Sequence, residues 1–110
     1  SMAPGLSPDA AVYLGERQVV GVGLDTPFVD AVAEGQLAGT ADPPAGAQAG
    51  TPFAAHHHFL TEVGVHTLEN IRLRELIEDG VSLSCTLILP PLTQGAAGAP
   101  IRPVAIGVPQ

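Results

Sequence analysis

The sequence contains no lysine, and its 110 residues include only four arginines: Arg17, Arg72, Arg74 and Arg102. Eleven acidic residues leave a formal net charge of -7. Nucleic acids and anionic membrane surfaces bind proteins through basic patches, which release counterions or offset the surface charge. The shortage of positive charge therefore argues against nucleic acid and against membranes as partners.

Cysteine and long apolar runs are also scarce. The single cysteine, Cys85, excludes an internal disulfide, and its apolar setting "SLSCTLILP" predicts a buried structural thiol in a reducing compartment. No apolar run approaches the roughly 20 residues that span a bilayer, and no charged-then-apolar leader opens the chain. We therefore expect a cytoplasmic protein. Residues 1–2, "SM", are interpreted as the remnant of an expression tag.

Aromatic residues make up only 4% of the chain, whereas 45% of it is hydrophobic. A core must therefore be built mainly from Val, Leu, Ile and Ala. This composition is typical of a folded protein, because disordered chains combine low hydrophobicity with high net charge. The length suits one domain, which we place over residues 1–110.

The first half of the chain predicts a helix, a strand and a long loop. Ser7 suits a helix cap and Pro8 a first helical position, so residues 8–17 are expected to be helical. The β-branched run "VVGVGLD" predicts a buried strand whose glycines let another element approach closely. Residues 31–52 are rich in Ala, Gly and Pro and predict a loop, with room for one helical turn near residues 32–37.

The second half alternates helices and strands. "PFAAHHHFLTEVG" predicts a helix capped by Thr51, with Pro52 at its first position and Gly64 at its end. "VHTLENI" predicts a strand, and "RLRELIEDG" predicts a helix that ends at Gly80. "VSLSCTLILPPL" and "IRPVAIGV" predict two strands in a hairpin. The fold class expected is α/β, with a mixed sheet and flanking helices.

The three consecutive histidines cannot all reach one site from a helix, because successive side chains project about 100 degrees apart. Phe53 and Leu60 lie four residues before and three residues after His57, which places His57 on the apolar side. His56 then lies toward the flank, and His58 lies further round.

Glu69 is expected on the same strand face as Val65 and Thr67, opposite to His66. A carboxylate in such surroundings needs a cation or a partner, and an inward His with an inward Glu suits a divalent metal. Other interpretations remain open. His57 could be a hydrogen-bonded core histidine, and Glu69 could pair with an arginine. Two ligands are also fewer than the three that a catalytic zinc site usually takes, and no HExxH, CxxC, GxSxG or P-loop motif occurs.

Three blocks of the chain, in order, resemble the cyclase family of metal-dependent hydrolases, which includes kynurenine formamidases and isatin hydrolases. The blocks are "VVGVGLDTPFVD", "HHFLTEVGVHTLENI" followed by "RLREL", and "LILPPLTQGAAGAPIRPVAI". They are similar to the family's Gly-x-Asp-Thr-x-Ser-x-Asp, its His followed by Glu-Asn-Leu, and its closing Leu-Pro…Gly-x-x-Gly-x-Pro-Arg-x-Val-Ala. Phe28 departs from the pattern, since the family has a small polar residue there.

The resemblance implies the C-terminal part of the family's swivelling β/β/α fold. It also implies two ligands of a zinc or manganese ion, a His and a Glu twelve residues apart, and these correspond to His57 and Glu69. In the family the metal activates water against a small amide or formamide substrate.

The family's other ligands come from His-x-Gly-Thr-His-x-Asp in a preceding half, and nothing of that kind occurs here. We therefore expect a truncated or degenerate member that is inactive alone. The alternatives are a hydrolase completed by another chain and an interaction module without metal. Half a domain should expose apolar surface, so each alternative predicts a homodimer or higher oligomer.

Overall fold

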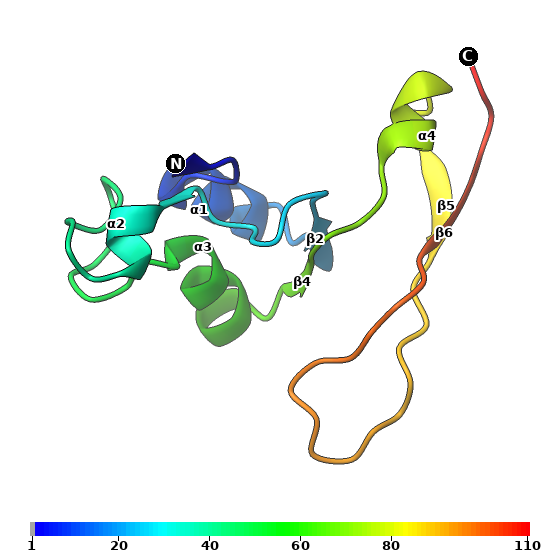
Figure 1. Cartoon of the computed structure of the whole chain (residues 1–110). Helices are drawn as coiled ribbons and strands as arrows, with labels where there is room; N and C mark the ends of the chain where they lie inside the picture. Colours follow the sequence, from blue (N-terminus) through cyan, green and yellow to red (C-terminus); the bar gives the residue numbers. More distant parts are fainter. Residues whose placement is uncertain (1) are drawn as a thin grey trace. The chain divides into compact units, whose positions relative to one another are not determined.

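The computed structural model describes residues 2–110, with side chains from residue 4 onward. Residue 1 of the expected tag remnant lies outside the described residues. The chain divides into two compact units, the first ending at Ile71 (unit 1) and the second formed by Arg72–Gln110 (unit 2) (Figure 1). One domain over residues 1–110 stays a prediction.

Short helices and short strands alternate along unit 1, as expected for an α/β protein. Its elements are β1 (Met2–Ala3), α1 (Pro8–Glu16), β2 (Gly21–Gly23), β3 (Val32–Ala33), α2 (Glu34–Leu37), α3 (Ala54–His57), the π-helix η1 (His58–Val63) and β4 (His66–Leu68). Unit 2 contains α4 (Arg74–Glu78), β5 (Ser84–Leu87) and β6 (Val104–Gly107).

The strands form three separate sheets, so the expected single mixed sheet is not present in the described part of the chain. β1 pairs with β3 and β5 with β6, both antiparallel, whereas β2 and β4 are parallel. The strand β2 is not buried as predicted, since Gly21 and Gly23 are exposed, but the close approach predicted for it is confirmed. A Cβ atom on Gly23 would lie 2.6 Å from Ile71 Cδ1, and one on Gly21 would lie 3.2 Å from Leu68 Cδ1.

Helix α1 begins as the sequence predicts. Ser7 accepts a hydrogen bond from the Ala10 amide at 3.2 Å, and Pro8 occupies the first helical turn. The helix buries Ala11 in the core of unit 1. The rest of this core comes from other segments of the same unit: Val29, Ala55, Phe59 and Val65.

Residues 31–52 include the expected helical turn, which is α2. The Gln36 side chain fixes this turn, because its Oε1 accepts from the Ala33 amide at 2.8 Å and its Nε2 donates to the Asp42 carbonyl at 2.9 Å. Two residues before the turn, at Val32, the chain pairs with β1. The predicted loop is therefore interrupted by short regular elements.

The helix that carries the histidines begins later than predicted. Phe53, not Thr51, is its N-cap residue, and the Thr51 hydroxyl donates instead to the Gln48 carbonyl at 2.6 Å. The helix changes winding at His58, where α3 gives way to the π-helix η1. It ends as expected at Gly64, whose φ of 69° is left-handed.

Unit 2 contains a hairpin and one short helix (Figure 1). The register pairs Ser84 with Gly107 and Leu87 with Val104, which confirms the predicted hairpin. No residue from 72 to 110 is buried. Cys85 is exposed, so the prediction of a buried thiol is wrong: this two-stranded sheet has no second layer over it. Within residues 2–110, no helix is long and apolar enough to cross a membrane.

Candidate functional site

Among the described residues, Asp30 is the charged residue that is buried, with 2% of its surface exposed. It directly follows Val29, a core residue, and its carboxylate reaches the start of α3. Oδ1 accepts from the Ala55 amide at 2.6 Å, and Oδ2 accepts from the His56 amide at 3.4 Å. The N-cap residue of α3, Phe53, has no side-chain acceptor for these amides. Asp30 therefore caps a helix that begins 24 residues later.

His56 bridges two carboxylates. Its Nδ1 contacts Asp30 Oδ2, and its Nε2 lies 2.8 Å from Glu69 Oε1. The Nδ1 contact is a hydrogen bond, whereas the Nε2 contact is a pair at ion-pair distance. The His56 ring therefore lies between the Asp30 and Glu69 carboxylates.

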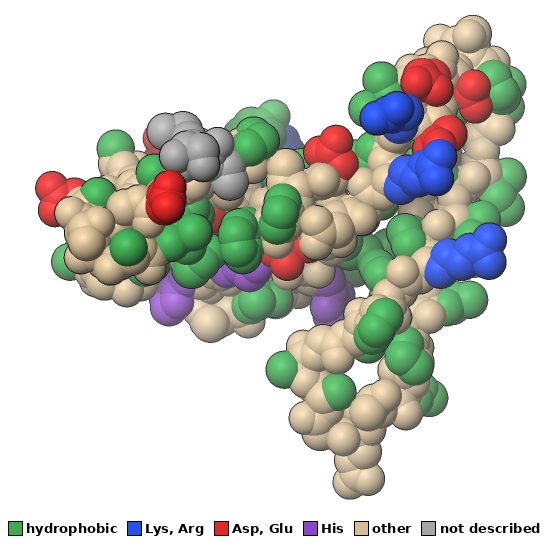
Figure 2. Space-filling view, in the orientation of Figure 1, with side chains coloured by type: hydrophobic (Ala, Val, Ile, Leu, Met, Phe, Trp, Pro, Cys, Tyr) green, Lys and Arg blue, Asp and Glu red, His purple; other side chains and the backbone are tan. Residues whose placement is uncertain are grey.

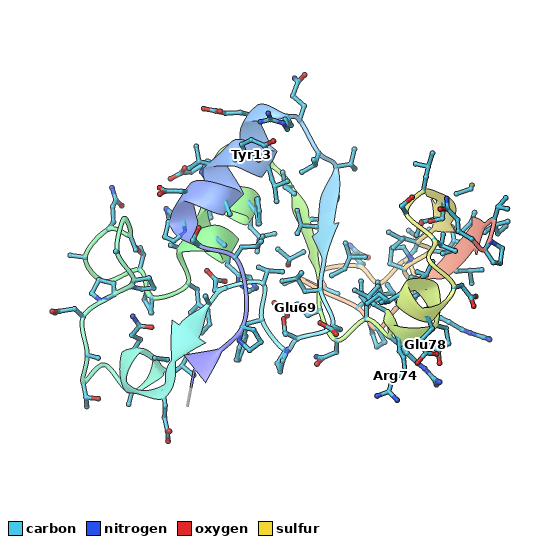
Figure 3. The ribbon with its side chains drawn as sticks, turned by 90° about the horizontal axis from the view of Figure 1, so that it is seen from above. Tyr13, Glu69, Arg74 and Glu78 are labelled. Carbon is cyan, nitrogen blue, oxygen red and sulfur yellow. The ribbon has the colours of Figure 1, made fainter. Side chains whose placement is uncertain are left out.

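Glu69 follows directly after β4 and is 29% exposed at its side chain (Figure 3). The same Oε1 that faces His56 also accepts from the Val29 amide at 3.3 Å. Its ion-pair partner in the structure is thus a histidine, whereas Arg72, one of the arginines considered for it, pairs with Glu75. These contacts fix Glu69 beside Asp30.

His57 does not face the core. Its side chain is 46% exposed, and its Nε2 lies 3.5 Å from Glu62 Oε1. The expected orientation is wrong because both reference residues lie outside regular α-helix: Phe53 is the N-cap, and Leu60 belongs to the π-helix. The buried stripe consists instead of Ala55 and Phe59.

His58 packs against α1 and contacts Glu62 rather than Glu69. Its Nδ1 lies 2.6 Å from Glu62 Oε2, and its Nε2 is buried without a hydrogen-bond partner among the described residues. A Cβ atom on Gly15 would lie 2.8 Å from that Nε2. His58 is therefore a packing residue, whereas His56, which we expected on the flank, contacts the carboxylates.

An open pocket of about 350 Å³ adjoins this group and is lined by residues 50–53, His56, His57, Leu60 and Thr61. Phe53 stacks at an angle on Phe28, with ring centroids 5.4 Å apart, and meets His56 edge-on at 5.8 Å. Phe28, which departs from the family pattern, thus supports the aromatic wall of the pocket. The pocket offers two imidazoles within mainly apolar surroundings.

Within residues 2–110, the structure brings together no complete set of metal ligands. Among the described residues, no group of three or more His, Cys, Asp or Glu side chains is placed to hold a metal. Glu69 is committed to His56 and Val29, and His57 to Glu62. Imidazole and carboxylate are suitable ligands for zinc or manganese, but a catalytic zinc site takes three from the protein. His57 and Glu69 as metal ligands stay a prediction.

Comparison with known proteins finds kynurenine formamidases among the chain's relatives. The chain is 30% identical over 101 residues to the kynurenine formamidases of Bacillus mycoides, Bacillus thuringiensis and Bacillus cereus. It resembles part of these enzymes. The match covers 92% of this chain and 39% of each relative, so the chain spans about two fifths of their length. No family model and no solved structure matches it.

Sequence reasoning missed the roles of Asp30 and His56. One signal for Asp30 was present, because it is the last residue of the first block that resembles the cyclase family. No comparable signal marked His56, since its choice over His57 depends on where α3 begins. Helix spacing alone therefore selected the neighbouring histidine.

Proposed function

We propose that this chain is a truncated or degenerate member of the cyclase family, related to metal-dependent amide hydrolases of the formamidase type, and that it is inactive alone. The observation that carries the proposal is the 101-residue similarity to kynurenine formamidases, which spans only 39% of their length. The three family-like blocks and their order support it. The group of Asp30, His56 and Glu69 beside an open pocket is consistent with it.

The residues present do not make up a metal centre by themselves, so no hydrolytic step is assigned to this chain alone. Glu69 and one histidine would serve as two ligands of zinc or manganese, and the remaining ligands would come from elsewhere. A small amide or formamide substrate would enter the pocket beside His56 and His57. Asp30 would hold the helix that carries both histidines.

The first experiment uses the chain by itself. Protein purified without a nickel column is analysed for zinc and manganese and assayed for hydrolysis of N-formylkynurenine. We expect less than one metal ion per chain and no turnover above that of the Glu69→Gln variant. One bound metal with turnover that Glu69→Gln abolishes would contradict inactivity.

The second experiment supplies the missing ligands. In a chimera, this chain replaces the 101 matched residues of the Bacillus mycoides enzyme. We expect the folded chimera to bind one metal ion and to hydrolyse N-formylkynurenine, and Glu69→Gln to remove both properties. His56→Ala and His57→Ala then separate the two histidines, because only the ligand should be needed for metal binding. A folded chimera that binds no metal would argue against the relationship.

The alternative is a hydrolase whose metal site is completed by a second chain. The exposed apolar side chains of unit 2 favour it. It predicts that specific activity rises with protein concentration, because the active species would be an assembly. Activity measured from nanomolar to high micromolar protein distinguishes the two proposals. No measurable activity at any protein concentration agrees with a chain that is inactive alone.

A further inference from the structure

Asp30 makes one contact more than a helix cap requires. Its Oδ1 accepts from the Ala55 amide at 2.6 Å, and a bond of this kind is what starts a helix such as α3. Its Oδ2 in addition contacts Nδ1 of the His56 ring. The Asp30 side chain is 3% exposed and the His56 side chain 23% exposed. A buried carboxylate thus lies behind a partly exposed imidazole.

The contacts of Asp30 determine how the His56 ring is turned. Backbone amides donate to both carboxylate oxygens, so Asp30 acts as an acceptor and Nδ1 of the ring donates to it. A neutral imidazole carries one proton, so Nε2 is then the nitrogen with the free lone pair. Nε2 lies 2.8 Å from Glu69 Oε1. Asp30 therefore directs the free nitrogen of His56 toward Glu69.

Glu69 is held by the same chain segment that carries Asp30. Its Oε1 accepts from the amide of Val29, the residue before Asp30, at 3.3 Å. Val29 is fully buried, so this donor is fixed in the core of unit 1. Glu69 Oε2 makes no hydrogen bond or ion pair among the described residues. An imidazole nitrogen and a carboxylate that converge in this way are suitable donors for one divalent cation.

His57 has no comparable support, although the twelve-residue spacing to Glu69 selects it. Figure 2 shows histidine side chains at the surface of unit 1, and the His57 side chain is 46% exposed. The carboxylate nearest to its ring belongs to Glu62, which is itself 53% exposed and 3.5 Å away. The two neighbouring histidines therefore differ in kind: a buried group orients His56, and no buried group orients His57.

We propose that Asp30 is a positioning residue of the candidate site, which fixes the His56 ring so that Nε2 and Glu69 are the two donors that this chain offers to zinc or manganese. Histidines that bind metals usually donate their other ring N–H to a carboxylate, which fixes the orientation of the ring. Asp30 itself is not a donor to the metal, because both of its oxygens are engaged. The inference rests on the proposed function, since it assigns roles within that metal site.

The first test uses the whole chain without metal. Long-range proton–nitrogen NMR in alkaline buffer shows which nitrogen of each neutral histidine ring carries the proton. We expect the His56 proton on Nδ1. Asp30→Asn keeps an oxygen for the Ala55 amide and turns its NH2 group toward the ring, so the proton should move to Nε2. Asp42→Asn, at an exposed aspartate, is the matched control and should leave the ring unchanged.

The second test measures the zinc dissociation constant of the folded chimera by competition with a chelator. We expect Asp30→Asn to raise this constant at least about tenfold, as is typical when a ligating histidine loses its hydrogen-bond partner. Because Asp30 acts through His56, Asp30→Asn should have little further effect in a His56→Ala background. A merely structural Asp30 would weaken zinc binding by the same factor in both backgrounds.

Three results would overturn the proposal. The first is an unchanged chain whose His56 proton lies on Nε2. The second is a chimera in which Asp30→Asn weakens zinc binding equally with and without His56. The third is a chimera in which His57→Ala weakens zinc binding more than His56→Ala. A folded chimera that binds no zinc would instead contradict the proposed function, and the ring measurements on the chain alone would then decide whether Asp30 positions His56.

Discussion

Asp30 connects two parts of unit 1 that lie far apart in the sequence. Its backbone lies beside the Leu6 segment, and its carboxylate holds the first turn of α3 and the His56 ring. No local pattern predicts such a residue, because its partners lie 25 and more residues away. Asp30 was therefore not predicted from the sequence, although it ends the first of the three family-like blocks.

Replacing Asp30 tests this role. Asp30→Asn removes the charge and one of the two acceptor oxygens, which leaves an α3 amide or the His56 ring without its partner. We expect a loss of about 1–3 kcal/mol in the free energy of unfolding, typical of a broken buried hydrogen bond to a charged group. Urea denaturation measures it. Asp42→Asn, at an exposed aspartate, is the matched control and should change stability little.

Arg72 and Glu75 allow a second test at this scale. The hydrogen bond from the Arg72 guanidinium, with backbone hydrogen bonding, lowers the pKa of the Glu75 carboxyl. A folded-state pKa below the unfolded value means that the pair stabilises α4 at neutral pH and that this effect is lost as pH falls through the lowered pKa.

We therefore expect Arg72→Gln to raise the pKa of Glu75 back toward its ordinary value. A carbon-detected NMR titration of the Glu75 carboxyl measures the change. Arg74→Gln removes the neighbouring arginine, which does not lower this pKa, and should leave the titration unchanged. Equal shifts in the two variants would mean that net charge, not the hydrogen bond, sets the pKa.

The elements differ in how well their boundaries follow from sequence. The start of α1 and the glycine ends at Gly64 and Gly80 were predicted, because caps and left-handed glycines act within a few residues. The start of α3 was not predicted, because the side chain that accepts from its first amides belongs to Asp30 and not to Thr51. The single mixed sheet also failed as a prediction, because pairing between distant strands depends on what covers them.

Gly5 shows how closely one segment must approach another. A Cβ atom on Gly5 would lie 2.3 Å from the carbonyl carbon and oxygen of Asp30, and backbone atoms cannot rotate away. We expect Gly5→Ala to separate the Leu6 segment from Asp30 and to cost about 1–3 kcal/mol of stability. Thermal unfolding measures it. Gly98→Ala, with no neighbour within 4 Å, should be nearly neutral.

At the scale of the whole molecule, the two units are packed very differently. Unit 1 has a small core around Phe59, whereas unit 2 has no buried residue. The sequence predicted exposed apolar surface on a chain that matches only part of its relatives, and the apolar side chains of the hairpin are exposed. It could not predict which strands would be left uncovered, because that depends on tertiary contacts.

Hydrogen exchange should reveal this difference. Under dilute conditions we expect the amides of Phe59 and Val65 to exchange slowly and those of β5 and β6 to exchange much faster, because stability against local opening follows burial. Mass spectrometry after peptic digestion measures both regions in one experiment. Equal protection in a monomeric sample would contradict the contrast between the units.

The change of winding at His58 has a consequence for the run of three histidines. A π turn holds one residue more than an α turn, and moving that extra residue along the helix advances the preceding segment by one position. His57 would then take the place of His56 between Asp30 and Glu69, twelve residues before Glu69. After such a one-residue slip, the repeated residue would still present an imidazole to the two carboxylates.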